Sequence, residues 1–150
     1  MGTVVNIRDV IDKKREADRH VQKGDEEVKN ENFKKAEFLY EVALEKYSGF
    51  MKPPVSLYER LSDCRLYMKR FTDAVKTLED CLNRHPDNIS VLVKLGMMHI
   101  DHWTEIQDPA AAVRYFSRVK ELKPEYKSRA MTISAMLAYA SSYSKQENHR

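Results

Sequence analysis

The chain has 150 residues, of which 42% are apolar and 33% are charged, and its formal net charge at pH 7 is +3. This length predicts one domain, the 4 glycines and 5 prolines are few enough for an ordered, helix-rich protein, and so small a net charge does not by itself indicate nucleic-acid binding. No stretch approaches the roughly 20 apolar residues of a membrane span and the N-terminus lacks the pattern of a signal peptide, so we expect a cytoplasmic protein with no transmembrane segment.

The first predicted helix begins after Asn6, whose side chain can cap it, and runs to about Asn30. Ile7, Val10 and Ile11 recur at helical spacing on one side of its first half. This half precedes the repeated pattern described below. We expect it to pack on the rest of the chain as an N-terminal lid.

Polar residues and prolines divide the rest of the first half of the chain. Residues 29–32 predict a turn, residues 33–47 a second helix, and Gly49 its end. Pro53 and Pro54 stop that helix and suit the first turn of a third one.

Prolines and an N-cap residue also predict where the later helices end or begin. Pro86 ends the fourth helix, and Asp108 followed by Pro109 is typical of an N-cap and a first helical position. A seventh helix is predicted over residues 127–145. No alternating pattern indicates a β-strand.

Small and bulky residues recur in the same order three times along the chain. Equivalent positions lie 34 or 38 residues apart: 38 from Ala36 to Ala74 and from Ala74 to Ala112, and 34 from Ser62 to Gly96. The residues of the pattern are Gly24, Phe33, Ala36, Tyr40, Ala43 and Leu44; then Leu61, Ser62, Phe71, Ala74, Leu78, Cys81 and Pro86; then Leu95, Gly96, Ala112, Phe116 and Pro124.

This order resembles the tetratricopeptide repeat, a helical hairpin of about 34 residues. The resemblance covers about residues 17–126 and implies an all-α fold: a right-handed α-solenoid of three tetratricopeptide-like helix-turn-helix repeats plus a C-terminal capping helix. His99 departs from the pattern, because it stands where the repeat has Tyr. The expected divisions of a single domain over residues 1–150 are an N-terminal helical extension (1–16), repeat one with its linker (17–54), repeat two (55–88), repeat three (89–126), a capping helix (127–145) and a tail (146–150).

By similarity to the family, the first helix of each repeat lines a concave groove. Acidic and apolar residues alternate at these positions, which favours an extended or helical peptide that carries Lys or Arg beside an apolar anchor. The alternative is that this face is solvated and binds nothing. The expected groove residues are Asp18, Val21, Asp25 and Val28 in repeat one; Glu59, Asp63, Leu66 and Tyr67 in repeat two; and Val93, Met97, Ile100 and Asp101 in repeat three.

The resemblance implies a non-enzymatic protein-interaction module without a cofactor, serving as a scaffold, an adaptor or a subunit of a larger complex. One alternative is a co-chaperone, because some members of the family hold the acidic tail of heat-shock chaperones with a clamp of Lys, Arg and Asn. The matching positions hold Val21, Asp25, Arg60, Ser90 and Lys94. Only Arg60 and Lys94 have the required charge, and Asp25 would repel a carboxylate, so we expect no clamp.

A second alternative is RNA binding at the turns of repeats one and two. Lys29, Lys34, Lys35, Lys69 and Arg70 gather there and could form a basic edge. No aromatic residues are interleaved with them, so a solvated face is the simpler interpretation and nucleic acid is an unlikely partner.

Metal and thiol chemistry have little support in the sequence. His99, His102 and Glu105 lie three apart, but the other ligands of a tetrahedral site would have to come from elsewhere, and we expect no metal site. Cys64 and Cys81 fall at small helix-contact positions, where reduced cysteines pack as small apolar residues. A disulfide between them is the less favoured alternative.

The last predicted helix has no charged residue over residues 130–144, although a helix that closes a solenoid normally has a polar outer face. We expect a second stripe of this helix to be covered by another copy of the chain, giving a homodimer, or by a different partner. The stripe expected to pack on repeat three is Ala130, Ile133, Leu137 and Ala140. The expected association surface is Met136, Tyr139 and Tyr143, with Trp103 on a projecting turn as a further candidate.

Overall fold

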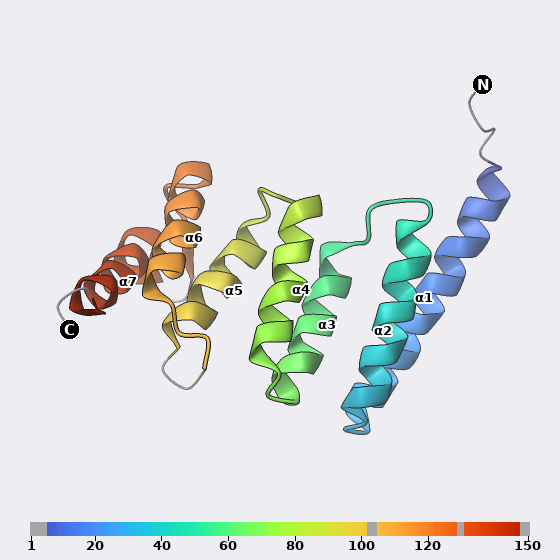
Figure 1. The fold of residues 1–150 in the computed structure, drawn as a ribbon. Coiled ribbons are helices and arrows are strands. Elements are labelled where there is room, and N and C mark those ends of the chain that lie inside the picture. The colour runs from blue at the N-terminus through green and yellow to red at the C-terminus, as the bar shows by residue number, and fades with distance from the viewer. Residues whose placement is uncertain (1–5, 102–104, 129–130, 148–150) are drawn as a thin grey trace. The chain divides into compact units, whose positions relative to one another are not determined.

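The structure is a computed structural model that describes residues 6–101, 105–128 and 131–147, and these residues are almost entirely helical (Figure 1). The chain divides into two compact units, residues 1–77 and 78–150, and α4 runs from one unit into the other. The helices are α1 (Ile7–Lys29), α2 (Phe33–Ser48), α3 (Val55–Tyr67), α4 (Phe71–Arg84), α5 (Ile89–Ile100), α6 (Pro109–Leu122) and α7 (Ile133–Glu147).

Two helices begin at the caps that the sequence predicts. The side-chain oxygen of Asn6 accepts a hydrogen bond from the backbone N–H of Arg8 at 3.0 Å, which starts α1. Asp108 accepts from the N–H of Ala111 at 3.1 Å, and Pro109 occupies the first turn of α6. Because each side chain satisfies an N–H that has no partner inside the helix, these start positions are fixed locally.

In the first unit, α1 and α2 pack side by side along the length of α2, and α3 packs against α2 (Figure 1). Small residues at the contact positions allow the helices to approach closely, as the repeated pattern predicts. The buried cluster consists of Ala17, Ala36, Tyr40, Ala43, Tyr47, Leu57, Leu61 and Cys64.

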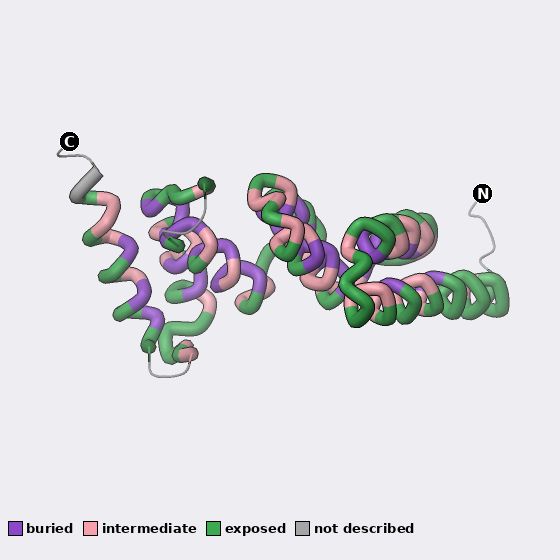
Figure 2. The backbone as a smooth tube through the Cα atoms, turned by 90° about the horizontal axis from the view of Figure 1, so that it is seen from below, coloured by how far each residue is buried: buried purple, intermediate pink, exposed green. Residues whose placement is uncertain are grey.

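The first part of α1 extends beyond α2 and does not form the expected lid. Ile7 and Ile11 are exposed, and Val10 is only partly buried. Figure 2 shows these turns as an exposed stretch at the N-terminal end of the described chain. The reason is that α2 has only 16 residues against the 23 of α1, so no described element of this unit covers the first turns of α1.

Two glycines lie beneath aromatic rings, one in each unit. A Cβ on Gly24 would lie 2.5 Å from Cε1 of Tyr40, and a Cβ on Gly96 would lie 2.4 Å from Cε1 of Phe116. In repeat two the equivalent residue is Ser62, which is buried and donates a hydrogen bond to the carbonyl of Ala74 at 3.0 Å. The small residues of the pattern are therefore required where one helix crosses the next.

A buried carboxylate links three helices of the first unit. Glu37 of α2 accepts hydrogen bonds from Nε of Arg65 at 2.8 Å and from Nη1 of Arg70 at 2.6 Å. Arg65 lies on α3 and also donates to Thr77 of α4, while Arg70 pairs with Asp73. Burial alone would raise the pKa of Glu37, but the hydrogen bonds from the two guanidinium groups lower it.

The turns after α1 and α3 have the same backbone conformation. Glu31 has φ of 58° and Lys69 has φ of 60°, the left-handed region, and no other non-glycine residue of the described chain has positive φ. Each residue stands two positions before the first residue of the next helix, Phe33 or Phe71.

In the second unit, α5, α6 and α7 pack in chain order around a second buried cluster. Its residues are Leu92, Val93, Ile100, Ala112, Phe116, Val119, Ile133, Met136 and Ala140. His99, the residue that departs from the repeat pattern, is buried and stacks on Tyr115 with ring centres 5.8 Å apart.

The seventh helix begins later than predicted. Residues 127–128 (β1, Lys127–Ser128) and 131–132 (β2, Met131–Thr132) form a short antiparallel pair, and α7 starts at Ile133 rather than at residue 127. The hydroxyl of Thr132 accepts a hydrogen bond from the N–H of Ala135 at 3.1 Å. This side-chain cap fixes the start of α7, and the sequence analysis overlooked it.

Candidate functional site

A cavity of about 260 Å³ opens between α1 and α3 in the first unit. Residues three and four apart on each helix face it, because such residues share one side of a helix. Four of the predicted groove residues, Asp25, Val28, Asp63 and Tyr67, meet there. The full lining is Asp25, Val28, Lys29, Tyr40, Arg60, Asp63, Cys64 and Tyr67.

Asp25 is held in place from two sides. Its Oδ1 accepts a hydrogen bond from the hydroxyl of Tyr40 at 2.6 Å and from Nε of Arg60 at 3.0 Å. Burial, and then the bond to this carboxylate, raise the pKa of Tyr40, so its hydroxyl remains a donor at any physiological pH. Oδ2 of Asp25 receives no hydrogen bond within the described part of the chain.

The middle of the chain matches a known repeat. Residues 57–88, which span α3, α4 and the turn that follows, match the sequence model of the tetratricopeptide repeat. The chain contains a tetratricopeptide repeat. No curated protein matches the chain in sequence.

Solved tetratricopeptide domains share the fold of nearly the whole chain. The first tetratricopeptide domain of Spaghetti (RPAP3), bound to the HSP90 peptide SRMEEVD, matches with a TM-score of 0.66 and 15% identity, covering 88% of this chain and 95% of that one. The tetratricopeptide domain of OM64 from Arabidopsis matches with a TM-score of 0.62 and 14% identity, covering 90% and 98%. The all-α tetratricopeptide solenoid predicted from the sequence is therefore confirmed.

A second acidic residue that the sequence places in the groove is anchored in the same way as Asp25. Asp18 lies two turns earlier on α1 and accepts a hydrogen bond from the hydroxyl of Tyr47, which lies two turns after Tyr40 on α2. Burial and this bond raise the pKa of Tyr47 to about 12. For Asp18, burial acts to raise the pKa, but the hydrogen bonds from Tyr47 and Lys14 outweigh it and lower the pKa.

The sequence analysis did not predict these two Tyr–Asp pairs. The available clue was the spacing, since the two acids and the two tyrosines are each seven residues apart. Of the other groove residues predicted in this unit, Val21 packs partly buried against the core, and Glu59 and Leu66 are partly buried.

The groove predicted for repeat three is partly wrong. Val93, with 9% of its surface exposed, and Ile100 belong to the buried cluster of the second unit together with Ile133 and Met136 of α7. The capping helix thus shares a core with residues that the repeat pattern alone assigns to the groove. Met97 and Asp101 are exposed, as a groove residue requires.

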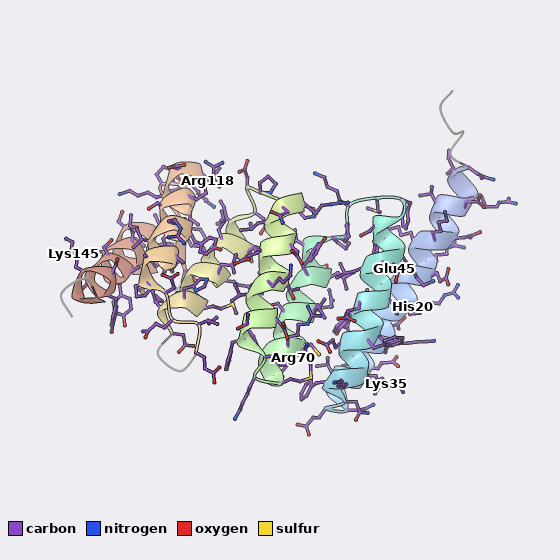
Figure 3. All side chains as sticks on the ribbon, viewed as in Figure 1. His20, Lys35, Glu45, Arg70, Arg118 and Lys145 are labelled. Carbon is purple, nitrogen blue, oxygen red and sulfur yellow. The ribbon has the colours of Figure 1, made fainter. Side chains whose placement is uncertain are left out.

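The turns of repeats one and two form a wider hollow of about 630 Å³. Its lining is Glu31, Asn32, Phe33, Lys34, Lys35 and Met68. Two residues of the predicted basic edge, both labelled in Figure 3, form ion pairs within the chain: Lys35 pairs with Glu27 at 3.3 Å, and Arg70 binds Glu37. An aromatic pair that the sequence did not reveal lies at the same edge, because Phe33 stacks on Tyr67 with ring centres 5.1 Å apart.

One residue of the association surface predicted on α7 is buried instead of exposed. Met136 is 3% exposed and belongs to the core, so its assignment to the outer stripe was wrong. It lies three residues after Ile133 and four before Ala140, both of which are buried, so it shares their side of the helix. Tyr139 is exposed, Tyr143 is partly exposed, and their hydroxyls lie 3.1 Å apart. Trp103 lies outside the described residues.

No group of three or more metal-binding side chains lies together in the described ranges of the chain. His99 instead places its Nδ1 3.0 Å from the carbonyl of Ile106, and His102 lies outside the described residues. Cys64 and Cys81 are buried and reduced. Burial raises the pKa of Cys64 to about 11, so this thiol is not a nucleophile at neutral pH. Among the described residues, no helix is long and apolar enough to cross a membrane.

Proposed function

We propose that the chain is a non-enzymatic protein-interaction module, an adaptor or a subunit of a larger complex, that binds a basic peptide in the cavity between α1 and α3. The observation that carries the proposal is the anchoring of Asp25 at this cavity. Its Oδ1 is bound by Tyr40 and Arg60, and Oδ2 has no donor within the described residues. A Lys or Arg of a peptide would supply that donor.

The charge along this groove favours the same kind of peptide. Asp25 and Asp63 line the cavity together with Lys29 and Arg60. Asp18 and Glu59 are the other acidic residues expected in the groove, and Asp18 pairs with Lys14. Complementary charge steers binding and excludes partners of the wrong sign. Tyr67, with 64% of its surface exposed, and Val28 supply an apolar contact beside the charges, where an apolar or aromatic anchor of the peptide would pack.

A displayed library of random peptides tests this proposal. We expect the chain to enrich peptides that carry Lys or Arg beside an apolar residue. Reversal of two groove charges, Glu59→Lys with Asp63→Lys, should remove this preference and weaken the selected peptides by about 10- to 100-fold, the range for charge pairs of an interface. The matched control is the reversal Glu79→Lys with Asp80→Lys on α4, outside the cavity lining, which should leave binding intact. Equal effects of the two reversals would contradict the proposal.

The co-chaperone alternative is suggested by one similar structure, which holds the HSP90 peptide SRMEEVD. In this chain, Asp25 and Arg60 occupy two of the positions expected for a clamp, and they bind one another. A tail carboxylate would have to displace Asp25 from Arg60 and would meet its negative charge. We therefore propose that acidic tails are not ligands. Calorimetry with the peptide SRMEEVD should give no heat of binding, and micromolar affinity would refute this.

One feature of the structure favours the RNA alternative and another opposes it. The Phe33–Tyr67 stack brings aromatic rings to the basic edge, but Lys35 and Arg70 are already neutralised by carboxylates. Binding that relies on phosphate contacts weakens steeply with salt. Retention of single-stranded RNA at low salt, lost at high salt, would favour this alternative, whereas the peptide proposal expects no retention.

Association through α7 is a further part of the proposal. Tyr139 and Tyr143 remain at the surface after Met136 is assigned to the core. Tyrosine is enriched at interfaces because it offers a large ring and a polar hydroxyl. We propose that a partner protein covers these rings, and that Tyr139→Glu weakens that contact.

A further inference from the structure

The outward side of α2 is apolar at its centre. Phe38 has 63% of its surface exposed, and Val42, one turn later, is partly exposed. Neither residue belongs to the buried cluster of the first unit or lines the peptide cavity. Because Phe38 and Val42 lie one turn apart on the same side of the helix, together they form a small contiguous apolar patch.

The other two repeats do not have this feature. The residues 38 positions after Phe38 and Val42 are Lys76 and Asp80, and the residues 76 positions after them are Arg114 and Arg118. All four are exposed and charged. The equivalent helix faces of repeats two and three are thus polar, and among the second helices of the three repeats, all within the described residues, the apolar centre belongs to α2.

Opposite charges lie at the two ends of the same face. Lys34 lies one turn before Phe38, and Glu45 lies one turn after Val42. Within the described part of the chain neither of them makes an ion pair, whereas Glu41 between them is bound to Arg65. Figure 3 shows Glu45 toward one end of α2 and Lys35, the neighbour of Lys34, toward the other.

We propose that this face binds a second copy of the chain, with the two α2 helices antiparallel about a two-fold axis. In such an arrangement residue i contacts residue j and residue j contacts residue i. Lys34 then faces Glu45 of the second copy, and Phe38 faces Val42 of the second copy, each twice. The midpoints of both pairs fall at about residue 40, so one axis satisfies both. In a parallel arrangement Lys34 would face Lys34 and Glu45 would face Glu45.

The interface is small, so we expect the affinity of the dimer to be low. One pair of four-turn helices buries less surface than a stable dimer requires, so the association should be weak, with Kd of about 10 µM to 1 mM. Because charge pairs at its rim contribute, the dimer should weaken as salt is added. The proposal does not depend on the peptide cavity, since no residue of the interface lines it.

Sedimentation equilibrium from about 10 µM to about 1 mM, the range expected for Kd, tests the proposal. The average mass should rise with concentration from 17.6 kDa toward twice that value. Phe38→Glu should remain a monomer throughout, with circular dichroism unchanged. Arg114→Glu, the same position in repeat three, is the matched control and should dimerise like the unaltered chain. A monomer at about 1 mM, or a dimer retained by Phe38→Glu and lost by Tyr139→Glu, would overturn the proposal.

Charge exchange tests the antiparallel register. Lys34→Glu and Glu45→Lys place two pairs of like charges at the interface, so each variant alone should dimerise about tenfold more weakly. When the two variants are mixed, both rim pairs become attractive, and a mixed dimer should form more readily than either homodimer. The double variant should regain the affinity of the unaltered chain. Failure of both the mixture and the double variant to recover affinity would refute this register.

Discussion

Gly24 and Gly96 show how single residues determine the helix packing. Each lies directly beneath an aromatic ring of the helix that follows it, Tyr40 in the first unit and Phe116 in the second. The ring fills the space that a side chain would occupy. Gly49 at the end of α2 is different, because the nearest atom to a Cβ there is the carbonyl oxygen of Lys46 at 3.5 Å, an ordinary contact.

Substitution by alanine distinguishes the two glycines beneath rings from Gly49, which lies in an open site. Gly24→Ala and Gly96→Ala force the ring or the helix to move, so each should lower the free energy of unfolding by about 1–3 kcal/mol, the usual cost of overpacking a core. Gly49→Ala should change it by less than about 1 kcal/mol, because the site is open and alanine restricts the unfolded chain. Urea denaturation measures all three. Equal losses would show that ring contact is not the cause.

Glu37 predicts how stability depends on pH. Its hydrogen bonds to Arg65 and Arg70 hold its pKa below the usual value despite burial, so the native state favours the ionised form. The resulting stabilisation is fully present above the unfolded pKa of about 4.3 and is lost as the pH falls through the lower native pKa. Glu37→Gln should cost about 2 kcal/mol at pH 7.

The same variant should also lose part of the pH dependence. The difference in stability between pH 7 and pH 3 should be smaller for Glu37→Gln than for the unaltered chain, as measured by urea denaturation at both values. Glu26→Gln, an exposed residue of α1, is the control and should keep the full difference. An unchanged pH dependence in Glu37→Gln would show that other carboxylates are responsible.

At the scale of the helices, the turns after α1 and α3 are built alike. Glu31 and Lys69 adopt the left-handed conformation. Glycine adopts this conformation readily, whereas it destabilises other residues by about 1–2 kcal/mol. Neither turn has the glycine that this backbone favours. The conformation is held because the preceding helix ends with hydrogen bonds from Glu31 to the carbonyl of Val28 and from Lys69 to that of Leu66.

Glycine at these positions should therefore stabilise the protein. Lys69→Gly and Glu31→Gly relieve the strain but add freedom to the unfolded chain, and the net gain should be about 0.5–1 kcal/mol each. Asn30→Gly is the control, because Asn30 has φ of −88° and gains nothing from glycine, so that variant should be less stable. Thermal unfolding ranks the three, and a loss of stability in Lys69→Gly would refute the argument.

Helix positions that depend on short-range chemistry could be predicted from the sequence. The caps at Asn6 and Asp108 and the turn before Phe33 involve residues that are close in the chain. The start of α7 depended on a strand pair of two residues on each side, and so short a pair leaves no periodic pattern. Thr132 as a cap could have been recognised, since threonine is a common N-cap.

The residues that line the cavity were predicted to lie together where they belong to a single repeat pair, and the prediction failed where another element intervenes. Asp25 and Asp63 meet at one cavity because the repeat spacing brings α1 and α3 together. Val93 and Ile100 were assigned to the groove by the same spacing, but α7 shares their core. The position of a capping helix is not contained in the repeat pattern, which describes only how one hairpin meets the next.

At the scale of the whole molecule, the packing is local along the chain. The helix pairs with extensive contacts among the described residues are consecutive: α1 with α2, α2 with α3, α5 with α6, and α6 with α7. Each unit has its own buried cluster, one assembled from α1, α2 and α3 and the other from α5, α6 and α7. Stability in such a chain is approximately a sum of hairpin and neighbour terms.

Local packing has a consequence for the speed of folding. Only short loops must close before helices meet, so little chain entropy is lost before contacts form, and helical chains of this kind fold in about microseconds to milliseconds. Either unit can form its cluster first. A temperature jump or a rapid dilution from urea, started after a brief unfolding pulse that gives the prolines no time to isomerise, should show recovery of circular dichroism within about 10 ms. Recovery that takes seconds after such a pulse would mean that contacts distant in sequence limit folding.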